Sequence, residues 1–291
     1  MKIIASINDN NIYRGFLKPF LNYYDHLGVS VYVAYVGLNP PEGMDQDRFL
    51  HIDPIPGYDL GIQAKLARSY YATRLDDNEL LTFSDIDMFI LDLQWYRNSI
   101  AKFVPYLKSG LLDLLVFGAN GYKTFNGYRP DVDGKWTIPY MTATPLGIRN
   151  ALGIDFYDTF ESFLRSYQLI KKPIDGKEST LNDFENFSDE SLYRWAVMST
   201  FSRVAHVDLP DFHFQRPGRR IDRICDNFEL YGHDEFDSNF WEQQKCTQNQ
   251  RQKMANGEFL DLWPQRPYEK HRELIDDILS FYTKNNNFGK A

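Results

Sequence analysis

The sequence is poor in cysteine, has no excess of positive charge and contains no long apolar run. Its two cysteines, Cys225 and Cys246, have no close metal-ligand spacing, so we interpret them as free thiols in a reducing compartment, with a disulfide as the alternative. The 32 Lys and Arg residues against 40 Asp and Glu residues give a net charge of −8, which argues against a nucleic-acid partner. No apolar run approaches the length of a transmembrane segment, and the N-terminus has the pattern of a strand rather than a signal peptide. These absences favour a cytoplasmic protein.

The length and the high aromatic content of the chain are typical of a globular protein with aromatic side chains on its surfaces. A chain of 291 residues is long enough for one large α/β domain or two small ones with a substantial core. Aromatic residues make up 16% of the chain, a high share that suits open clefts in which rings stack against ligands.

Strand and helix patterns alternate along the chain. The alternation predicts an α/β protein with a Rossmann-related, open mixed sheet flanked by helices, and with a C-terminal helical extension. The predicted strands are 2–7, 29–37, 49–55, 80–91 and 111–117, and the predicted helices are 12–27, 61–75, 95–110 and 269–283.

Two aspartates interrupt the most apolar of these strands, residues 80–91. Asp85 and Asp87, with one apolar residue between them, stand at its carboxyl end, where open α/β sheets usually bind ligands. Aspartate is rare in strands and is seldom buried without a partner, so the pair needs a compensating positive charge. Mg²⁺ and Mn²⁺ prefer carboxylate oxygen. The pattern therefore predicts a metal site, and the alternative is a turn cap at Asp85 with a solvent-facing Asp87.

Basic and short polar side chains are expected at the same edge of the sheet. Lys65 and Arg68 are three residues apart and share one face of the predicted helix 61–75. Ser6 and Asn8 end the first strand. The basic pair can hold a negatively charged ligand, and the polar pair can meet a base and a ribose. The alternatives are a solvated basic stripe and an ordinary turn.

Two acids open a further predicted helix, from Asp189 to about Val204. Ser188 can cap this helix, and the carboxylates of Asp189 and Glu190 are favourable beside its N-terminus. One of the two carboxylates can instead project into a cleft as a general base. The sequence leaves both interpretations open.

A histidine-bearing strand then runs into a loop with three arginines, in an otherwise acidic chain. His206 and His213 are candidate ligands because imidazole binds Mn²⁺ and similar metals. Arg216, Arg219 and Arg220 can clamp a diphosphate. The alternatives are a hydrogen-bonded structural histidine and arginines that pair with neighbouring aspartates.

Loops rich in glycine and aromatic residues follow the strand 111–117. The segments 118–122 and 126–130 are too polar to be core, and such loops often carry specificity. We interpret their rings, with Trp136, as a lining for a sugar acceptor, and plain packing is the alternative.

Together these features resemble the GT-A class of nucleotide-sugar-dependent glycosyltransferases, known for its Asp-x-Asp motif. The resemblance covers roughly residues 1–220. It is carried by the alternating N-terminal region, Lys65 and Arg68, the motif Ser84-Asp85-Ile86-Asp87, the acids Asp189 and Glu190, and the segment from His213 to Arg220.

The resemblance implies a metal-dependent glycosyltransferase of polysaccharide biosynthesis. Such an enzyme transfers a sugar from a nucleotide diphosphate sugar, expected here to be a UDP-sugar, to a hydroxyl of an oligosaccharide or glycan acceptor. It implies a catalytic domain at 1–220, with a nucleotide-sugar-binding half at 1–92 and an acceptor-binding half at 93–220. Residues 221–291 are then an extension packed on the same domain.

The resemblance also implies roles for single residues. Asp87 binds Mn²⁺ or Mg²⁺, Asp85 contacts the ribose or the metal, and His213 completes the metal shell, with His206 as the alternative. The remaining implied donor ligands are Ser6, Asn8, Lys65, Arg68, Arg219 and Arg220. Asp189 or Glu190 is the base if the enzyme inverts the sugar, and a retaining enzyme needs no such base.

Two rival classes remain, each with a distinguishing feature. A sugar nucleotidyltransferase usually carries a Gly-rich basic loop directly after the first strand, and here that loop is Asn8-Asp9-Asn10-Asn11. A non-catalytic glycan-binding protein has no use for a buried Asp-x-Asp.

Overall fold

The computed structural model of the chain describes residues 1–41, 45, 47–117, 141–153, 159–170, 193, 202–207, 212–213, 216–217, 220–222, 259–264 and 266–285. Within these residues, no helix combines the length and the apolar character that a membrane crossing needs. The strands are β1 Lys2–Asn8, β2 Val31–Val36, β3 Phe49–Ile52, β4 Leu81–Phe83, β5 Phe89–Ile90, β6 Leu114–Phe117, β7 Met141–Ala143, β8 Val204–Val207, β9 Phe212–His213, β10 Arg216–Pro217, β11 Arg220–Asp222 and β12 Asp261–Trp263. The helices are α1 Asn11–Arg14, α2 Leu17–His26, α3 Leu60–Ala72, α4 Leu93–Ala101, α5 Val104–Lys108, α7 Pro145–Leu152, α8 Phe160–Ile170 and α12 Tyr268–Asn285.

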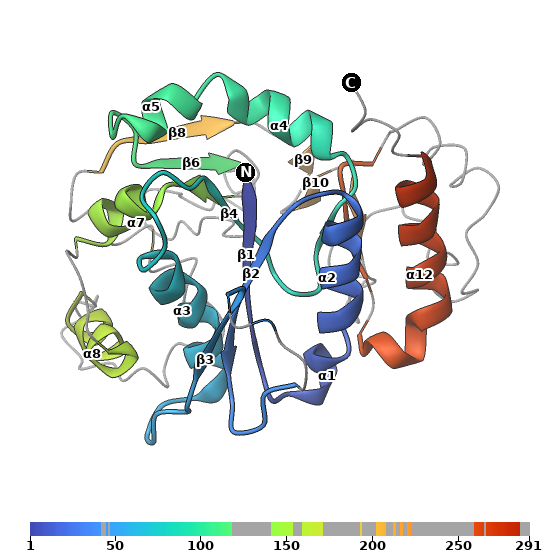
Figure 1. The fold of residues 1–291 in the computed structure, drawn as a ribbon, viewed down its shortest axis with the longest axis horizontal. Helices are drawn as coiled ribbons and strands as arrows, with labels where there is room; N and C mark the ends of the chain where they lie inside the picture. Colours follow the sequence, from blue (N-terminus) through green and yellow to red (C-terminus); the bar gives the residue numbers. More distant parts are fainter. Residues whose placement is uncertain are drawn as a thin grey trace.

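Seven strands form one open sheet in the order β3-β2-β1-β4-β7-β6-β8. β7 runs antiparallel to both of its neighbours, and the other pairs described in this sheet are parallel. This mixed sheet with flanking helices confirms the predicted α/β fold class. β1 runs from the N-terminus towards α1 in the middle of the parallel part (Figure 1), so β1, β2 and β4 end at one edge.

Helices cover both faces of the sheet. On one face α2, α4, α5 and α12 build a core cluster that includes Ile3, Phe20 and Ile275. On the other face α3, α7 and α8 build a second cluster that includes Ile4 and Leu66. The neighbours Ile3 and Ile4 belong to different clusters because successive strand residues point to opposite faces. Figure 1 shows α2 and α12 side by side, across the sheet from α3.

Two of the predicted helices are each divided in two. The helix expected at 12–27 is α1 followed by α2, and Gly15 caps α1. Gly15 lies so close to α12 that a Cβ atom there would be 1.9 Å from Oε1 of Glu269. The helix expected at 95–110 is α4 followed by α5, because Pro105 has no N–H to continue the preceding turn.

The central apolar stretch, residues 80–91, forms two strands in different sheets. β4 belongs to the seven-stranded sheet, whereas β5 belongs to a three-stranded sheet of order β11-β12-β5. The residues between them turn, and the Met88 amide donates to the Asp85 carbonyl at 3.0 Å. The two aspartates therefore lie in a link between sheets, and the expectation of one interrupted strand is corrected.

The helix predicted from Asp189 to about Val204 does not extend as far as Val204. Val204 was included in that helix, but it begins β8, which pairs in parallel with β6. Tyr193, the described residue of this segment, has helical geometry, is fully buried and donates to Ser69 Oγ at 2.8 Å. Its ring packs edge-on against Phe83, with the centroids 5.8 Å apart.

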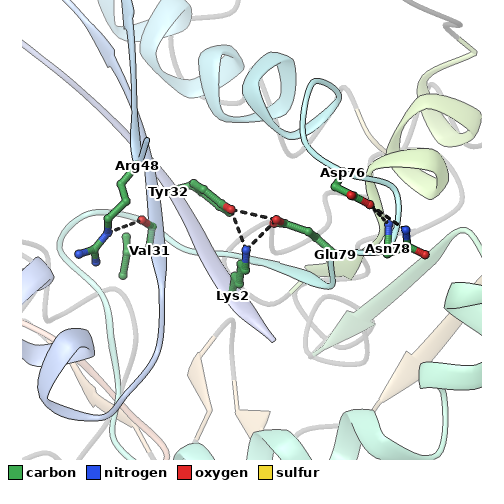
Figure 2. A network of polar contacts seen from close by, with 7 residues as sticks. All are labelled: Lys2, Val31, Tyr32, Arg48, Asp76, Asn78 and Glu79. Carbon is green, nitrogen blue, oxygen red and sulfur yellow. Dashed lines mark hydrogen bonds and ion pairs between the residues drawn. The ribbon is translucent and has the colours of Figure 1, made fainter. Parts of the chain in front are cut away.

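A polar network closes the amino edge of the sheet (Figure 2). Lys2 Nζ donates to Glu79 Oε1 at 2.6 Å and to the Tyr32 hydroxyl at 2.8 Å, and Tyr32 donates to the same Glu79 oxygen. Burial alone would lower the pKa of Lys2, but the hydrogen bonds to Glu79 and Tyr32, with their charge interactions, together outweigh burial and raise it. These charges hold the starts of β1, β2 and β4 together, at the edge opposite to the predicted site.

Candidate functional site

The candidate site lies where three adjacent parallel strands end. β1 ends at Asn8, β2 is followed by Gly37, and β4 is followed by Ser84. The Ser84 amide still pairs with the Ile4 carbonyl at 2.9 Å, so the chain leaves the sheet directly after it. The predicted aspartates therefore stand at the carboxyl edge, where open α/β sheets bind ligands.

Helix α3 brings basic side chains to this edge. Asp59 caps the helix by accepting from the Ile62 amide at 2.9 Å, and Asn8 Nδ2 donates to the Leu60 carbonyl at 3.4 Å. Two turns further along, Arg68 is 3% exposed and donates to both the Ser84 carbonyl and Asp85 Oδ1 at 2.8 Å. The structure thus joins two residues that the sequence predicted separately.

Lys65 lies between these two contacts along α3. It is half-buried and makes no hydrogen bond or ion pair with any described residue. Ser6 and Asn8 fall in strand register with Ile4, whose side chain packs in the cluster beneath α3. Ser6, Asn8 and Lys65 therefore share one face of the sheet.

Asp87 faces the other layer and is almost completely buried, at 1% exposure. Its Oδ2 accepts hydrogen bonds from Arg266 Nε at 2.5 Å and from Trp263 Nε1 at 3.1 Å. Both donors belong to the C-terminal segment, which the sequence pattern linked to no known function. The alternative of a solvent-facing Asp87 is wrong.

Arg266 is the site residue that the sequence analysis missed. Its guanidinium also donates to the Tyr13 hydroxyl at 2.5 Å and lies 4.4 Å from the centroid of the Tyr13 ring. Burial lowers the pKa of Arg266, but Asp87, with Tyr13 and more distantly Asp85, outweighs burial and raises it. A lone arginine after a short apolar strand gives no pattern from which this role can be predicted.

The two carboxylates of the Asp-x-Asp motif are therefore compensated by arginines from two layers. Arg68 pairs with Asp85 from α3, and Arg266 pairs with Asp87 from the C-terminal segment. The need for a compensating charge, from which a metal was predicted, is thus met within the chain. Among the residues that the structure describes, no three or more His, Cys, Asp and Glu side chains gather closely enough to hold a metal ion.

The three-stranded sheet brings the arginine-rich segment towards the motif. β11 starts at Arg220, which pairs with Asp261 of β12, and Asp261 pairs in turn with Ile90 of β5. β5 begins two residues after Asp87, so the backbone of Arg220 lies two strands away from the continuation of the motif.

Several predicted site residues are not placed by the described part of the chain. Asp189, Glu190 and Arg219 lie outside the described residues. The backbones of His206, His213 and Arg220 are described in β8, β9 and β11, and their side chains are not. The base, the imidazole ligand and the diphosphate clamp therefore stay predictions.

A groove of about 470 Å³ runs between α2 and α12. Gly15 and Tyr268 form one part of it, each within two residues of Tyr13 or Arg266 in the sequence. Polar and apolar groups both contribute to its lining. The residues that line it are Gly15, Lys18, Pro19, Asn22, Tyr23, His26, Tyr268, Arg272, Asp276, Leu279, Ser280 and Thr283.

The chain is similar to several solved structures, all at low sequence identity. No protein-family model and no curated protein matches the chain. The galactosyltransferase LgtC, solved with donor and acceptor sugar analogues, is 13% identical over 95% of this chain and 96% of its own, with a TM-score of 0.44. A glycosyltransferase involved in glycosylation of the major capsid of PBCV-1 is 10% identical over 94% of this chain and 99% of its own, with a TM-score of 0.41. TarS 1–349 of S. aureus is 12% identical over 71% of this chain and 58% of its own, with a TM-score of 0.35.

Proposed function

We propose that the protein transfers a sugar from a nucleotide diphosphate sugar, with a UDP-sugar as the expected donor, to a hydroxyl of a glycan acceptor. The observation that carries the proposal is the charge arrangement after β4. Asp85 and Asp87 follow β4 at the carboxyl edge, and each carboxylate pairs with a guanidinium. Asp85 pairs with Arg68, and Asp87 pairs with Arg266. Such a site suits a ligand that brings its own negative charge together with a bound cation.

The donor fits the face of the sheet that α3 covers. Ser6 and Asn8 offer short polar groups at the end of β1 for the base and ribose. Lys65, which has no ionic partner among the described residues, lies next along α3 and can pair with a phosphate. Arg68 holds Asp85 in place through its bond at 2.8 Å.

The residues present also fit a divalent cation. The donor set is carboxylate oxygen, which Mn²⁺ and Mg²⁺ prefer. A positive group, the Arg266 guanidinium, already lies 2.5 Å from Asp87 and is attracted by Asp85 as well. Asp85 and Asp87 would hold the metal, with His213 as the expected third ligand, and the bound ion would neutralise the departing diphosphate as a Lewis acid.

Removal of the acceptor proton depends on the stereochemistry of the transfer. An inverting enzyme needs a base behind the acceptor hydroxyl, and Asp189 or Glu190 is our candidate for it. Arg219 and Arg220 are the candidates for pairing with the diphosphate as it leaves. A retaining enzyme would use the arginines in the same way and need no base.

The proposal predicts that UDP and Mn²⁺ together raise the melting temperature by more than the sum of their separate effects. Asp87→Asn should abolish this extra shift, because the motif carboxylate would join the two ligands. Asp76→Asn is the matched control, since Asp76 lies in the loop before β4 and bonds Asn78 at the amino edge (Figure 2). The measurement is thermal unfolding, with each variant compared with itself in the absence of ligands.

Three outcomes would contradict the proposal. If the shifts from UDP and Mn²⁺ are merely additive, the metal and the diphosphate do not bind as a unit. If the extra shift is undiminished in Asp87→Asn, the motif does not bind them. A UDP-sugar that reacts with added pyrophosphate to give UTP and a sugar 1-phosphate, instead of transferring its sugar and releasing UDP, would indicate a sugar nucleotidyltransferase.

A further inference from the structure

The pair formed by Asp87 and Arg266 is built into the fold from two neighbouring strands. Asp87 precedes β5, and Arg266 follows β12, which pairs with β5 in antiparallel register. The amides of Leu91 and Asp92 both donate to the Leu260 carbonyl, at 2.8 and 3.1 Å. Backbone pairing therefore fixes the guanidinium opposite the carboxylate, although the two residues are 179 positions apart.

Aromatic side chains hold the guanidinium in this position. The Tyr13 hydroxyl accepts from Arg266 Nη1, the face of its ring lies 4.4 Å from the guanidinium, and the Trp263 ring lies 5.9 Å away. Trp263 also donates to Asp87 at 3.1 Å. The Arg266 side chain is 24% exposed, so it is the solvent-side cover of an almost buried carboxylate.

A divalent cation at Asp87 would bind the carboxylate with which the Arg266 guanidinium already pairs. Two positive groups repel each other at such a distance, most strongly where water is excluded. We propose that Arg266 is the resident counter-ion of Asp87, which a divalent cation must displace, and that the released guanidinium then pairs with the phosphates of the donor. This inference rests on the proposed function, and it gives Arg266 a part in the binding of both the metal and the donor.

The first test measures binding of Mn²⁺ alone to the full chain, by electron paramagnetic resonance of the free ion. Arg266→Gln removes the competing charge and should tighten Mn²⁺ binding by about tenfold, equivalent to roughly 1.4 kcal/mol. Arg266→Lys keeps a competing charge and should remain close to the wild type. Arg272→Gln is the matched control, because Arg272 is 69% exposed on the same segment and pairs with Asp276.

The second test measures UDP binding by calorimetry at saturating Mn²⁺. Here Arg266→Gln should weaken UDP by about tenfold, because a phosphate partner has been lost. The same variant should leave uridine binding unchanged, since uridine carries no phosphate. Opposite effects on Mn²⁺ and UDP are a signature that a merely structural role would not give.

A milder variant keeps the test valid if Arg266→Gln does not fold. Tyr13→Phe removes one hydrogen bond to the guanidinium and keeps the ring, so it should tighten Mn²⁺ binding in the same direction by a smaller factor. Mn²⁺ affinity that is unchanged or weaker in both Arg266→Gln and Tyr13→Phe overturns the inference.

Failure of this inference is distinguishable from failure of the proposed function. If Asp87→Asn loses Mn²⁺ binding while Arg266→Gln does not tighten it, the motif binds metal and only the role of Arg266 is wrong. If Asp87→Asn leaves Mn²⁺ binding unchanged, the metal site of the proposed function is wrong, and the inference falls with it.

Discussion

Asp9 is a single residue that sets the shape of the carboxyl edge. Its carboxylate accepts from the Tyr35 hydroxyl and, at 2.8 Å, from the Leu38 amide, while Arg14 lies 3.7 Å away. A Cβ atom at Gly37 would lie 2.4 Å from Asp9 Oδ2, so any side chain there would have to displace the Asp9 carboxylate. Asp9 thus fastens the end of β2 beside Asn8, where the donor is expected.

The pKa of Asp9 predicts how the edge responds to acid. Burial would raise this pKa, but the hydrogen bonds from Tyr35 and Leu38, with the charge of Arg14, lower it below 3.8. A carboxylate with a lowered pKa contributes stability that is complete above its unfolded pKa and is lost as the pH falls through the folded pKa. Asp9→Asn should therefore cost about 1–2 kcal/mol at pH 7 and progressively less below about pH 4.

Urea unfolding at a series of pH values measures this difference. Asp53→Asn is the control, since the side chain of Asp53 is 84% exposed, and it should stay within about 0.5 kcal/mol of the wild type. A gap between wild type and Asp9→Asn that stays constant from pH 7 down to about pH 2.5 would show that the charge of Asp9 is not its source.

At the scale of helices and strands, close backbone contacts decide where elements can pack. Helix α7 is capped by Thr144, whose Oγ1 accepts from the Gly147 amide at 3.1 Å. Gly147 faces β6, and a Cβ atom there would lie 2.3 Å from the backbone oxygen of Asp113. Backbone cannot move aside as a flexible side chain can, so the absence of a side chain sets the distance between α7 and the sheet.

Gly147→Ala should therefore destabilise the protein, even though alanine favours helices by about 1 kcal/mol over glycine. Overpacking against Asp113 should outweigh that gain, for a net loss of about 1–3 kcal/mol in the free energy of unfolding. Leu146→Ala is the neighbouring control, because Leu146 is 38% exposed and should cost less. A Gly147→Ala variant as stable as the wild type would contradict the close packing of α7.

The sequence predicted elements well where the pattern is local. The helix expected at 61–75 is α3, with the Lys65–Arg68 face as predicted, because helical spacing is a property of neighbouring residues. Arg68 and Asp85 are 17 positions apart within one crossover, so their meeting follows from the predicted topology. The partner of Asp87 was not predictable, because it depends on a strand pairing between β5 and β12, and a two-residue strand has no pattern of its own.

At the scale of the whole molecule, the first strand and the last described helix share one core. Ile3 and Ile7 of β1 belong to the same cluster as Leu274, Ile275 and other residues of α12. Figure 1 shows α12 beside α2, which lies directly on the sheet. Arg266 lies in the chain between β12, which pairs with β5, and the start of α12. The stability of α12 and the geometry of the site are therefore linked.

Loss of packing at Ile275 should therefore weaken the fold as one unit. Ile275 is fully buried, and Ile275→Ala should lower the free energy of unfolding by about 2–5 kcal/mol. Glu273→Ala, on the exposed side of the same helix, should stay within about 0.5 kcal/mol of the wild type.

Native-state hydrogen exchange is the measurement, because it gives the opening free energy of each element separately. We expect the amides of β1, β2 and α12 to lose protection by the same amount in Ile275→Ala. Protection lost in α12 alone, with β1 and β2 unchanged, would show that the C-terminal helix opens by itself and that its packing does not support the carboxyl edge.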